Sequence, residues 1–482
     1  MIYDVLIVGA GVIGAMLARE LSRYRLSVCV LEKENDVAMG ASKANSGIIH
    51  GGYDPVPGTL KAKLNAEGVE LLFETARDLQ VPCIRNGSMV CAFGSEEEHI
   101  LLEKLYRRGF ENGISTHKLL TGDEARALEP NLSKAVSMVL YVPDAGIIGP
   151  YELTIAAMGN AMDNGAELRR NFQVSSIVRD ATAFRVTSEL GETLQSHYLV
   201  NCAGGYSDKL AAMAGDDFFT ITPRAGEYML LDKREGSRVK HTLFQCPTSN
   251  GKGILVTPTA HGNLLVGPTA VKVETPESRE TTGEGLAYVE RMALKSVPSV
   301  DFRQVITSFS GVRSTGNTGD FILKASERVP GLVHAGAVES PGLSCCVSIA
   351  RYLTRILEQE GLTLTEKENW NGKRKNPNAF QAMSEQEQDA FIRDNPAYGR
   401  IVCRCEMISE GEILDAIRTN PGALDMDGVK RRTRAGMGRC QGGFCGPYVM
   451  GLLSKELGIP MEAVTKKGEG SPMVLGRIGD DK

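Results

Sequence analysis

The stretch YDVLIVGAGVIGAMLARELSRYRLSVCVLEKE, residues 3–34, decides the fold of the front of the chain. It alternates an apolar strand, a glycine turn, an amphipathic helix and a second apolar strand. Gly9 permits a tight turn, Gly11 lets a pyrophosphate approach the backbone, and Gly14 lets the helix pack closely on the strand. Glu32 ends the second strand, where an acid can bind ribose hydroxyls. We therefore predict a Rossmann-type dinucleotide-binding unit.

The bulk composition limits the class of protein. A chain of 482 residues predicts two or three domains, and 42% apolar with 23% charged residues is typical of a folded protein. A net charge of −5 gives no reason to expect nucleic acid or an anionic membrane as partner. No apolar run approaches the roughly 20 residues of a transmembrane helix. Since no secretory signal precedes the first strand, we expect a cytoplasmic protein.

The choice of dinucleotide depends on the chain beyond this first unit. No second G-x-G-x-x-G occurs after a strand, so one dinucleotide is expected. Residues 40–64, GASKANSGIIHGGYDPVPGTLKAKL, form a polar, glycine-rich passage where a nicotinamide dehydrogenase would continue its alternating strands and helices. This departure favours FAD.

Two later segments repeat the order of apolar strand, turn and helix. Residues 198–215 place a strand against small residues, and residues 331–357 contain a turn that opens a long helix. Free N–H groups at such a helix start can face a phosphate or an electron-rich ring edge. The predicted cofactor-binding residues are Gly9, Gly11, Gly14, Glu32, Ser42, Ser46, Gly47, Ala203, Gly204, Gly336, Pro341, Gly342, Leu343 and Ser344.

These motifs resemble the D-amino-acid-oxidase-like flavoproteins, which include FAD-dependent glycerol-3-phosphate dehydrogenases and L-2-hydroxyglutarate dehydrogenases. NSGIIHGG (45–52), PGTLKAKL (57–64) and PRAGEYMLL (223–231) are especially like the hydroxyglutarate group. IIHGG (48–52) and FSGVRSTGNTGDFIL (309–323) are also like the glycerol-3-phosphate group. The resemblance covers the N-terminal three quarters of the chain and implies FAD as cofactor.

The predicted fold is an α/β Rossmann-type FAD-binding domain with an interleaved antiparallel β-rich substrate domain, followed by a small helical domain. EYMLLDK, GILVTPT and NLLVGPTAVKV read as strands of the interleaved part. In the resembled family this sheet covers the flavin and the substrate lies between them. We expect an oxidoreductase over residues 1–355, with FAD-binding parts at about 1–84, 146–214 and 311–355, the β-rich part at about 85–145 and 215–310, a polar linker at 356–398 and the last domain at 399–482.

A flavin that takes a hydride from an alcohol needs a base for the hydroxyl proton and a group that holds the substrate. His50 lies in the glycine-rich passage and matches the histidine of HGG in the glycerol-3-phosphate enzymes. Arg313, in SGVRSTG, matches the arginine with which those enzymes hold the anionic group, and Arg224 is a second candidate. Lys61 and Lys63 are expected on a solvated helical face. His50 as a backbone-bonded loop residue, and Arg313 as a surface residue, are the alternatives.

The resemblance leaves the substrate open. Ser314 and Thr315 follow Arg313 where the glycerol-3-phosphate enzymes usually have P-L, and ESPGLSCC (339–346) stands where they commonly have G-G-K-[LW]-T. Glycerol 3-phosphate is the first expectation and L-2-hydroxyglutarate or another 2-hydroxy acid the second. Oxidation of an amine or amino acid, in which His50 need not be a base, is a third, and an electron-transfer subunit is the non-enzyme alternative.

Four of the 11 cysteines need an explanation of their own. Seven are scattered through the first 350 residues and read as small buried hydrophobes. Cys403 and Cys405 form C-x-C, and after 34 intervening residues Cys440 and Cys445 form C-x4-C. Zinc modules more often use C-x2–4-C pairs at both ends, and cysteine tetrads also hold [2Fe–2S] clusters.

The spacing, with GMGRCQGGFCG (436–446), strongly resembles the small helical bacterioferritin-associated-ferredoxin-like domain. This resemblance implies a [2Fe–2S] cluster on the four cysteines. Nearby basic residues would raise the cluster's potential or form a docking face for an acidic partner, and both effects are compatible. They are Lys430, Arg431, Arg432, Arg434 and Arg439.

Together these features predict an electron relay. A small anionic secondary alcohol gives two electrons to FAD, which passes them singly to the [2Fe–2S] cluster. Because no second nucleotide fingerprint is present, the next acceptor is expected to be a partner subunit, either an NAD-linked flavoprotein or a quinone-linked one.

Overall fold

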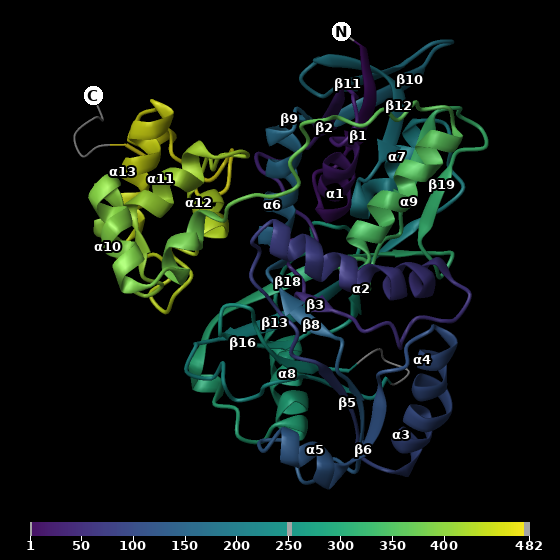
Figure 1. Cartoon of the computed structure of the whole chain (residues 1–482), viewed down its shortest axis with the longest axis vertical. Helices are drawn as coiled ribbons and strands as arrows, with labels where there is room; N and C mark the ends of the chain where they lie inside the picture. Colours follow the sequence, from purple (N-terminus) through teal and green to yellow (C-terminus); the bar gives the residue numbers. More distant parts are fainter. Residues whose placement is uncertain (1, 248–252, 477–482) are drawn as a thin grey trace.

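The computed structural model describes residues 2–247 and 253–476 (Figure 1). The opening unit folds as β1 (Ile2–Val8), α1 (Val12–Leu21) and β2 (Val28–Leu31), with β1 and β2 parallel. They lie inside an eight-stranded sheet whose main path runs β10-β11-β12-β1-β2-β9, with β20 beside β12 and β19 beside β20. The other strands are β9 (Glu167–Arg169), β10 (Val174–Arg179), β11 (Phe184–Ser188), β12 (Thr193–Asn201), β19 (Ile322–Ala325) and β20 (Leu332–Gly336).

Glycine is required where α1 meets the sheet. A Cβ on Gly9, whose φ is +106°, would lie 2.4 Å from the carbonyl oxygen of Cys202. A Cβ on Gly14 would lie within 2 Å of the carbonyl oxygen of Gly9. Both positions therefore exclude any side chain, and the helix can approach the strand ends closely. Helix α1 packs against α6 (Pro150–Asp163) and α9 (Cys346–Gln359), and α9 packs against α2 (Leu60–Asp78).

A second sheet of nine strands forms the lower body in Figure 1. Its order is β17-β13-β16-β15-β14-β5-β7-β6, with β18 also paired to β13. All pairs are antiparallel except β5 with β14, which is parallel. The strands are β5 (Ser88–Ala92), β6 (Lys118–Thr121), β7 (Met138–Val142), β13 (Ile221–Leu231), β14 (Thr242–Gln245), β15 (Leu255–Pro258), β16 (Leu264–Gly267), β17 (Val271–Lys272) and β18 (Val305–Gly316).

Helices interrupt the segments that the sequence predicts as β-rich. Between β5 and β7 the chain forms four short helices, and α8 packs on β13 and β16. A smaller sheet of three short strands, β3, β8 and β4, lies apart from both large sheets. These elements are α3 (Ser95–Ile100), η1 (Leu101–Tyr106), α4 (Arg107–Glu111), α5 (Gly122–Leu128), α8 (Gly283–Ser296), β3 (Ile48–Ile49), β4 (Cys83–Ile84) and β8 (Gly146–Ile148).

The polar segment after α9 crosses the FAD-binding part before it reaches the last domain. The indole of Trp370 packs beside the guanidinium groups of Arg19 and Arg23, with centroid distances of 5.5 and 5.1 Å. These cation–π contacts hold the segment against α1 and the residues that directly follow it. Within the described ranges, no helix has the length and apolarity needed to cross a membrane.

The C-terminal domain is a small helical body at the side of the molecule (Figure 1). Ser409 begins α11 with a capping box to Glu412. A short strand pair precedes α11, and two more helices follow it. The elements of this region are η4 (Pro377–Ala382), α10 (Glu385–Asp394), η5 (Pro396–Gly399), β21 (Ile401–Cys403), β22 (Ile408–Ser409), α11 (Glu410–Arg418), α12 (Met426–Thr433), α13 (Gly446–Leu457) and η6 (Met461–Ala463).

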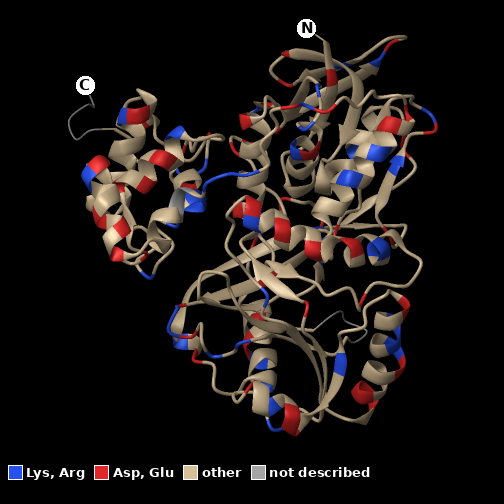
Figure 2. Ribbon diagram, in the orientation of Figure 1, with Lys and Arg blue, Asp and Glu red and all other residues tan. Residues whose placement is uncertain are grey.

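A buried ion cluster joins this domain to the FAD-binding part. The carboxylate of Asp36 accepts hydrogen bonds from Arg431 (2.5 Å) and from two nitrogens of Arg432 (2.8 Å each). All three residues are buried. Figure 2 shows the basic residues of α12 on the side of the domain that faces the main body, where α12 contacts α6. Asp36 therefore ties the C-terminal domain to the segment that follows β2.

Candidate cofactor and substrate site

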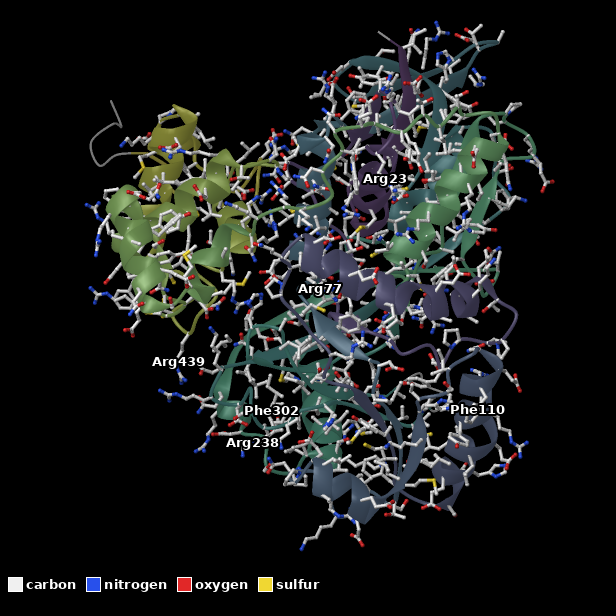
Figure 3. All side chains as sticks on the ribbon, in the orientation of Figure 1. Arg23, Arg77, Phe110, Arg238, Phe302 and Arg439 are labelled. Carbon is white, nitrogen blue, oxygen red and sulfur yellow. The ribbon has the colours of Figure 1, made fainter. Side chains whose placement is uncertain are left out.

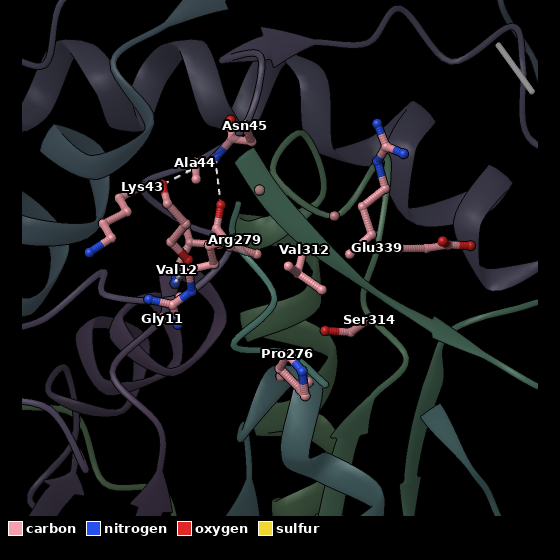
Figure 4. A pocket seen from close by; sticks show the side chains of 18 of the residues that line it. Gly11, Val12, Lys43, Ala44, Asn45, Pro276, Arg279, Val312, Ser314 and Glu339 are labelled. Carbon is pink, nitrogen blue, oxygen red and sulfur yellow. Dashed lines mark hydrogen bonds between the residues drawn. The ribbon is translucent and has the colours of Figure 1, made fainter. Parts of the chain in front are cut away.

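One cavity of about 1820 Å³ collects most of the predicted site residues. Its lining comes from the β1–α1 turn, residues 40–50, the turn after β12, strands β13 and β18, and the turn before α9. Figure 4 shows Gly11, Val12 and Lys43 on one side of this cavity and Ser314 and Glu339 on the other. A space of this size at the carboxyl end of parallel strands fits a dinucleotide with a small substrate.

The residues at the start of α1 line the part of the cavity where the sequence predicts the dinucleotide. Gly9 and Gly11 line it, and the N–H of Val12 donates to Ser42 Oγ (2.8 Å). Glu32 also lines it, and its carboxylate accepts hydrogen bonds from the N–H groups of Ala10 (2.8 Å) and Glu34 (3.0 Å). Burial raises the pKa of Glu32 to about 7 although these N–H groups oppose the shift.

The remaining predicted cofactor contacts divide into two groups. Seven line the cavity: Ser46, Gly47, Ala203, Gly204, Pro341, Gly342 and Leu343. Gly14, Gly336 and Ser344 do not line the cavity. Ser344 Oγ accepts a hydrogen bond from the backbone N–H of His50 (2.8 Å), so its place is to hold the segment that carries His50.

The three predicted catalytic residues belong to the same cavity. His50, Arg224 and Arg313 all line it. His50 Nε2 lies 3.3 Å from Ser340 Oγ, and its ring stacks on Phe244 at 5.8 Å between centroids. Arg224 on β13 stands directly opposite Arg313 on β18 in the antiparallel register. Within the described ranges neither guanidinium has a hydrogen bond or ion pair, so two uncompensated positive charges face one space.

Several features of the cavity and its surroundings could not be predicted from the sequence. Tyr228 hydrogen-bonds through its hydroxyl with Ser46 (3.2 Å) and stacks on Phe309 at 4.8 Å. The alternating pattern of residues 223–231 predicts a strand, yet it cannot tell which face lies over a cofactor. The sequence places Lys61 in solvent, but its side chain is 13% exposed and pairs with Glu339 (2.9 Å). That pairing joins α2 to the turn before α9, elements far apart in sequence, so no local pattern reports it.

The four C-terminal cysteines form two pairs. The sulfur atoms of Cys405 and Cys440 lie 3.7 Å apart, and the thiols of Cys403 and Cys445 are hydrogen-bonded to each other. Two thiolates on one tetrahedral metal with bonds of about 2.3 Å would be about 3.8 Å apart. Among the described residues, no group of three or more His, Cys, Asp or Glu side chains converges on a single ion. Two pairs fit a centre of two irons better than one zinc ion.

Backbone N–H groups surround these sulfur atoms. The Cys403 thiol has its pKa lowered to about 6, first by its hydrogen bond with Cys445 and then by the N–H groups of Gly436, Glu406 and Cys405. Desolvation raises the pKa of Cys440, but the N–H groups of Phe444, Gly442 and Gly443 and the thiol of Cys405 outweigh it and lower the pKa. The partner thiols behave in the opposite way: the pKa of Cys445 is raised, first by its hydrogen bond with Cys403, and, although the Cys440 N–H opposes the shift, the Cys440 thiol raises the pKa of Cys405. Each pair therefore favours one thiolate, the form that binds iron.

The basic residues near the cysteines mostly have partners inside the chain. Arg431 and Arg432 bind Asp36, and buried Arg434 donates to Glu406 (2.9 Å) and to Asn263 (3.0 Å). Arg439 lies at the edge of the domain toward the second sheet and donates to Gln304 (3.0 Å; Figure 3). A docking face for a separate acidic partner is therefore wrong for Arg431, Arg432 and Arg434, because they are buried within this chain.

The cysteine loops border the large cavity. Met437, three residues before Cys440, lines it, and the hydroxyl of Tyr151 donates to the Met437 sulfur (3.5 Å). Tyr151 lines the same cavity at the start of α6. The cavity that begins at the glycine turn thus extends to the segment that carries the second cysteine pair.

Comparison with known families accounts for both parts of the chain. Residues 4–356 match the family described as FAD dependent oxidoreductase, and residues 401–455 match the BFD-like [2Fe-2S] binding domain. The glycine turn, the buried Glu32 and the cavity fit FAD, and the two cysteine pairs fit a [2Fe–2S] cluster.

Individual relatives agree with this assignment. A protein from Caloramator mitchellensis named glycerol 3-phosphate dehydrogenase is 44% identical over 474 residues, 98% of each chain. A glycerol 3-phosphate oxidase of Mycoplasma pneumoniae is 34% identical and covers 77% of this chain and 97% of its own. The structure of an L-alpha-glycerophosphate oxidase from that organism with FAD bound superimposes with a TM-score of 0.74 at 33% identity, covering 77% of this chain and 98% of its own.

Proposed function

We propose that this chain, which belongs to the FAD dependent oxidoreductase family, oxidises glycerol 3-phosphate to dihydroxyacetone phosphate and passes the electrons to a separate acceptor. Its cofactors are FAD and a [2Fe–2S] cluster. The observation that carries the substrate proposal is the pair of unpaired arginines, Arg224 and Arg313, opposite each other in the cavity that also holds His50. A whole-length relative named for this substrate supports it.

Arg313 would bind the phosphate. A guanidinium presents parallel N–H groups that match two oxygens of a phosphate, and Arg313 spends none of them inside the described protein. Its position near the C-terminal end of β18, paired with β13, would fix where the anionic end of the substrate lies. The carbon that reacts is then placed by the length of the substrate between Arg313 and His50.

His50 would take the proton from the substrate hydroxyl. Ser344 and Asn65 hold its backbone, Asn65 by donating to the His50 carbonyl (2.9 Å), while Ser340 lies within hydrogen-bond reach of Nε2. Phe244 covers the ring and keeps water away from one face. When bound, FAD supplies the hydride acceptor and the cluster supplies a one-electron acceptor. The protein's own contribution is to orient the alcohol and remove its proton.

Electrons would leave the chain near the cysteine loops. Phe444, between Cys440 and Cys445, is 88% exposed, and Cys405 is exposed as well. An aromatic side chain beside a redox centre is a contact that an electron-accepting protein can cover. We propose a partner subunit, NAD-linked or quinone-linked, as the acceptor. The purified chain should accordingly reduce a one-electron dye but not NAD.

A 2-hydroxy acid dehydrogenase is the second candidate, and a specific observation favours it. A dicarboxylate such as L-2-hydroxyglutarate needs two cationic groups, and Arg224 supplies a second one across from Arg313. Ser314 and Thr315, which follow Arg313, also differ from the usual glycerol-3-phosphate pattern.

The test is anaerobic bleaching of the flavin absorbance with each substrate. Glycerol 3-phosphate should bleach it fastest, and Arg313→Ala should lower kcat/KM about 100-fold or more, since a charge-assisted two-point contact is lost. Arg303→Ala, at a side chain 88% exposed, is the matched control and should behave like the native protein. Faster bleaching by L-2-hydroxyglutarate would move the assignment to the second candidate. Unchanged turnover in both Arg313→Ala and His50→Ala would exclude a dehydrogenase site here.

A further inference from the structure

The C-terminal domain contributes part of the wall of the large cavity. Asp427, Lys430 and Arg431 of α12 line it together with Lys466 and Lys467. They share that wall with Gly11, Val12, Ser42 and Lys43, the residues at the start of α1. The domain that carries the cysteines therefore borders the same space as the dinucleotide turn.

Several cationic side chains gather at this border, and two of them have no ion pair within the described ranges. Lys430 is half-buried, and its side-chain ammonium makes no hydrogen bond or ion pair within the part of the chain that is described, because the nearby carboxylate of Asp427 pairs with Lys466 (3.3 Å). Lys43, also half-buried, reaches only the sulfur of Met39 (3.6 Å). Arg279, in the loop after β17, lines the same space.

Arg431 adds a buried donor with no acceptor. The residue is 6% exposed, and one terminal nitrogen binds Asp36 (2.5 Å). Its Nε is buried without a hydrogen-bond partner among the described residues. A buried N–H that lacks an acceptor is costly, and here it belongs to a residue that lines the cavity.

The pKa values of the two lysines respond chiefly to burial. Burial, followed by the charges of Arg431 and Arg279, lowers the pKa of Lys43 to about 8. Burial likewise lowers the pKa of Lys430. Burial thus outweighs the opposing attraction of Asp427 at both lysines, and of Glu34 at Lys43.

We propose that the C-terminal domain completes the FAD site, with Lys430 and Arg431 binding the diphosphate of the cofactor together with Lys43. The diphosphate is the anion expected at the start of α1, where Gly11 allows close approach and the first turn carries no acidic residue. This proposal depends on FAD as the cofactor and not on which alcohol is oxidised. The Mycoplasma oxidase structure with FAD corresponds to only 77% of this chain, so the contact is additional to the core FAD fold.

Asp36 fixes the position of Arg431 in this proposed contact. The carboxylate that holds Arg431 and Arg432 follows β2 by only a few residues and precedes Lys43. Docking of the cysteine domain and formation of the diphosphate site thus use the same segment. Loss of FAD should loosen the domain, and loss of the domain should weaken FAD, because linkage is reciprocal.

The experiment measures the FAD dissociation constant of the full-length protein by flavin fluorescence. Lys430→Ala removes a cation that has no partner within the described protein, so it leaves no buried charge behind. Loss of one charge-assisted contact should weaken FAD about tenfold. Lys455→Ala, an exposed lysine of α13 in the same domain, is the matched control and should leave the constant unchanged. Lys430→Arg should restore most of the affinity.

Two ligand probes identify the part of FAD that is held. ADP carries the diphosphate, and its competition with FAD should weaken about tenfold in Lys430→Ala. Adenosine lacks phosphate, and its competition should be unchanged. Iron content shows that the cysteine domain remains folded in each variant.

The outcomes separate this proposal from the proposed reaction. Equal FAD and ADP affinities in native protein and Lys430→Ala would overturn it, as would an equal loss in Lys455→Ala. Equal weakening of adenosine would mean that Lys430 supports the fold and does not contact the diphosphate. None of these results bears on whether glycerol 3-phosphate is the substrate, which the bleaching test decides by itself.

Discussion

The two cofactor sites of this chain are built in contrasting ways. The dinucleotide cavity draws on segments from Val8 to Lys467, and its predicted cofactor contacts rely largely on backbone groups and on the absence of side chains. The cluster site draws on four thiols between Cys403 and Cys445. The first site spreads its binding energy over many small contacts, whereas the second depends on each ligand. A single substitution should therefore weaken FAD binding without abolishing it, whereas loss of one cysteine should remove most of the cluster.

The strongest test of this contrast is Cys405→Ser. Serine oxygen does not replace a thiolate on iron well, so the variant should lose most of its two irons per chain. FAD content and anaerobic bleaching of the flavin by substrate should remain near native values, because no cavity residue changes. Iron analysis together with the absorbance spectrum measures both. Parallel loss of FAD would show that the cluster is needed to keep the C-terminal domain, with Lys430 and Arg431, in place at the cavity.

A smaller but still severe effect is expected for Gly9→Ala at the other site. The added Cβ would lie 2.4 Å from the Cys202 carbonyl oxygen at a φ of +106°, so the turn must shift or strain. Strain of about 1–3 kcal/mol, with displacement of the N–H groups that face the diphosphate, should weaken FAD at least 100-fold. Gly58→Ala, also at positive φ but with open space around it, is the control for backbone strain alone. Native FAD affinity in Gly9→Ala would contradict the role of this turn.

The features that could be predicted from the sequence are those whose residues lie close together along the chain. The glycine spacing, the strand–helix–strand order and the four cysteines are local patterns, and the fold class and both cofactors can be inferred from them. Ser409 as a helix cap is local too. Each of these features depends on residues within a few positions of one another, where chain geometry alone fixes the relation.

Features that depend on distant contacts could not be predicted. Asp36 meets Arg431 and Arg432 across almost 400 positions, and nothing near either end marks the pair. Local pattern therefore assigns the basic run to the cluster or to an acidic partner, whereas three of its members are buried inside the chain. The parallel pairing of β5 with β14 and the helices before β7 escape prediction for a related reason. Strand direction and local helices are decided by tertiary packing that single-sequence patterns do not encode.

The junction between the two sites can be broken with Asp36→Asn. Burial alone would raise the pKa of Asp36, but Arg432 and Arg431 outweigh it and hold the pKa well below its usual range. Removing the charge leaves two buried arginines without an anion, at a cost of about 3–5 kcal/mol. The C-terminal domain should undock, and cleavage by trypsin in the segment 360–398 should accelerate.

The pH dependence of this junction has a definite sign. Because the folded pKa of Asp36 is depressed, its contribution is complete above the unfolded value of 3.8 and is lost only as pH falls below that value. Docking should therefore survive from neutral pH to about pH 4. Asp217→Asn, at an exposed carboxylate paired with Arg328, serves as the control and should change neither property. Undocking of the native protein near pH 6 would contradict the assignment of the junction to Asp36.

The smallest expected effect concerns Glu32, which belongs to the dinucleotide site alone. Burial raises its pKa to about 7 from 4.5, so below pH 7 the cofactor-free protein holds a proton there that the unfolded chain has released. The stability that this proton carries is present below pH 4.5 and declines as pH rises through 7. In the predicted contact a ribose hydroxyl donates its hydrogen bond best to the ionised carboxylate, so FAD binding is expected to release the proton. FAD affinity should thus rise up to about tenfold per pH unit at most below pH 7 and level off above it. Glu32→Gln should remove this slope while Cys405→Ser keeps it, because only the first variant changes the dinucleotide site. An identical slope in native protein and Glu32→Gln would assign the titration to another group.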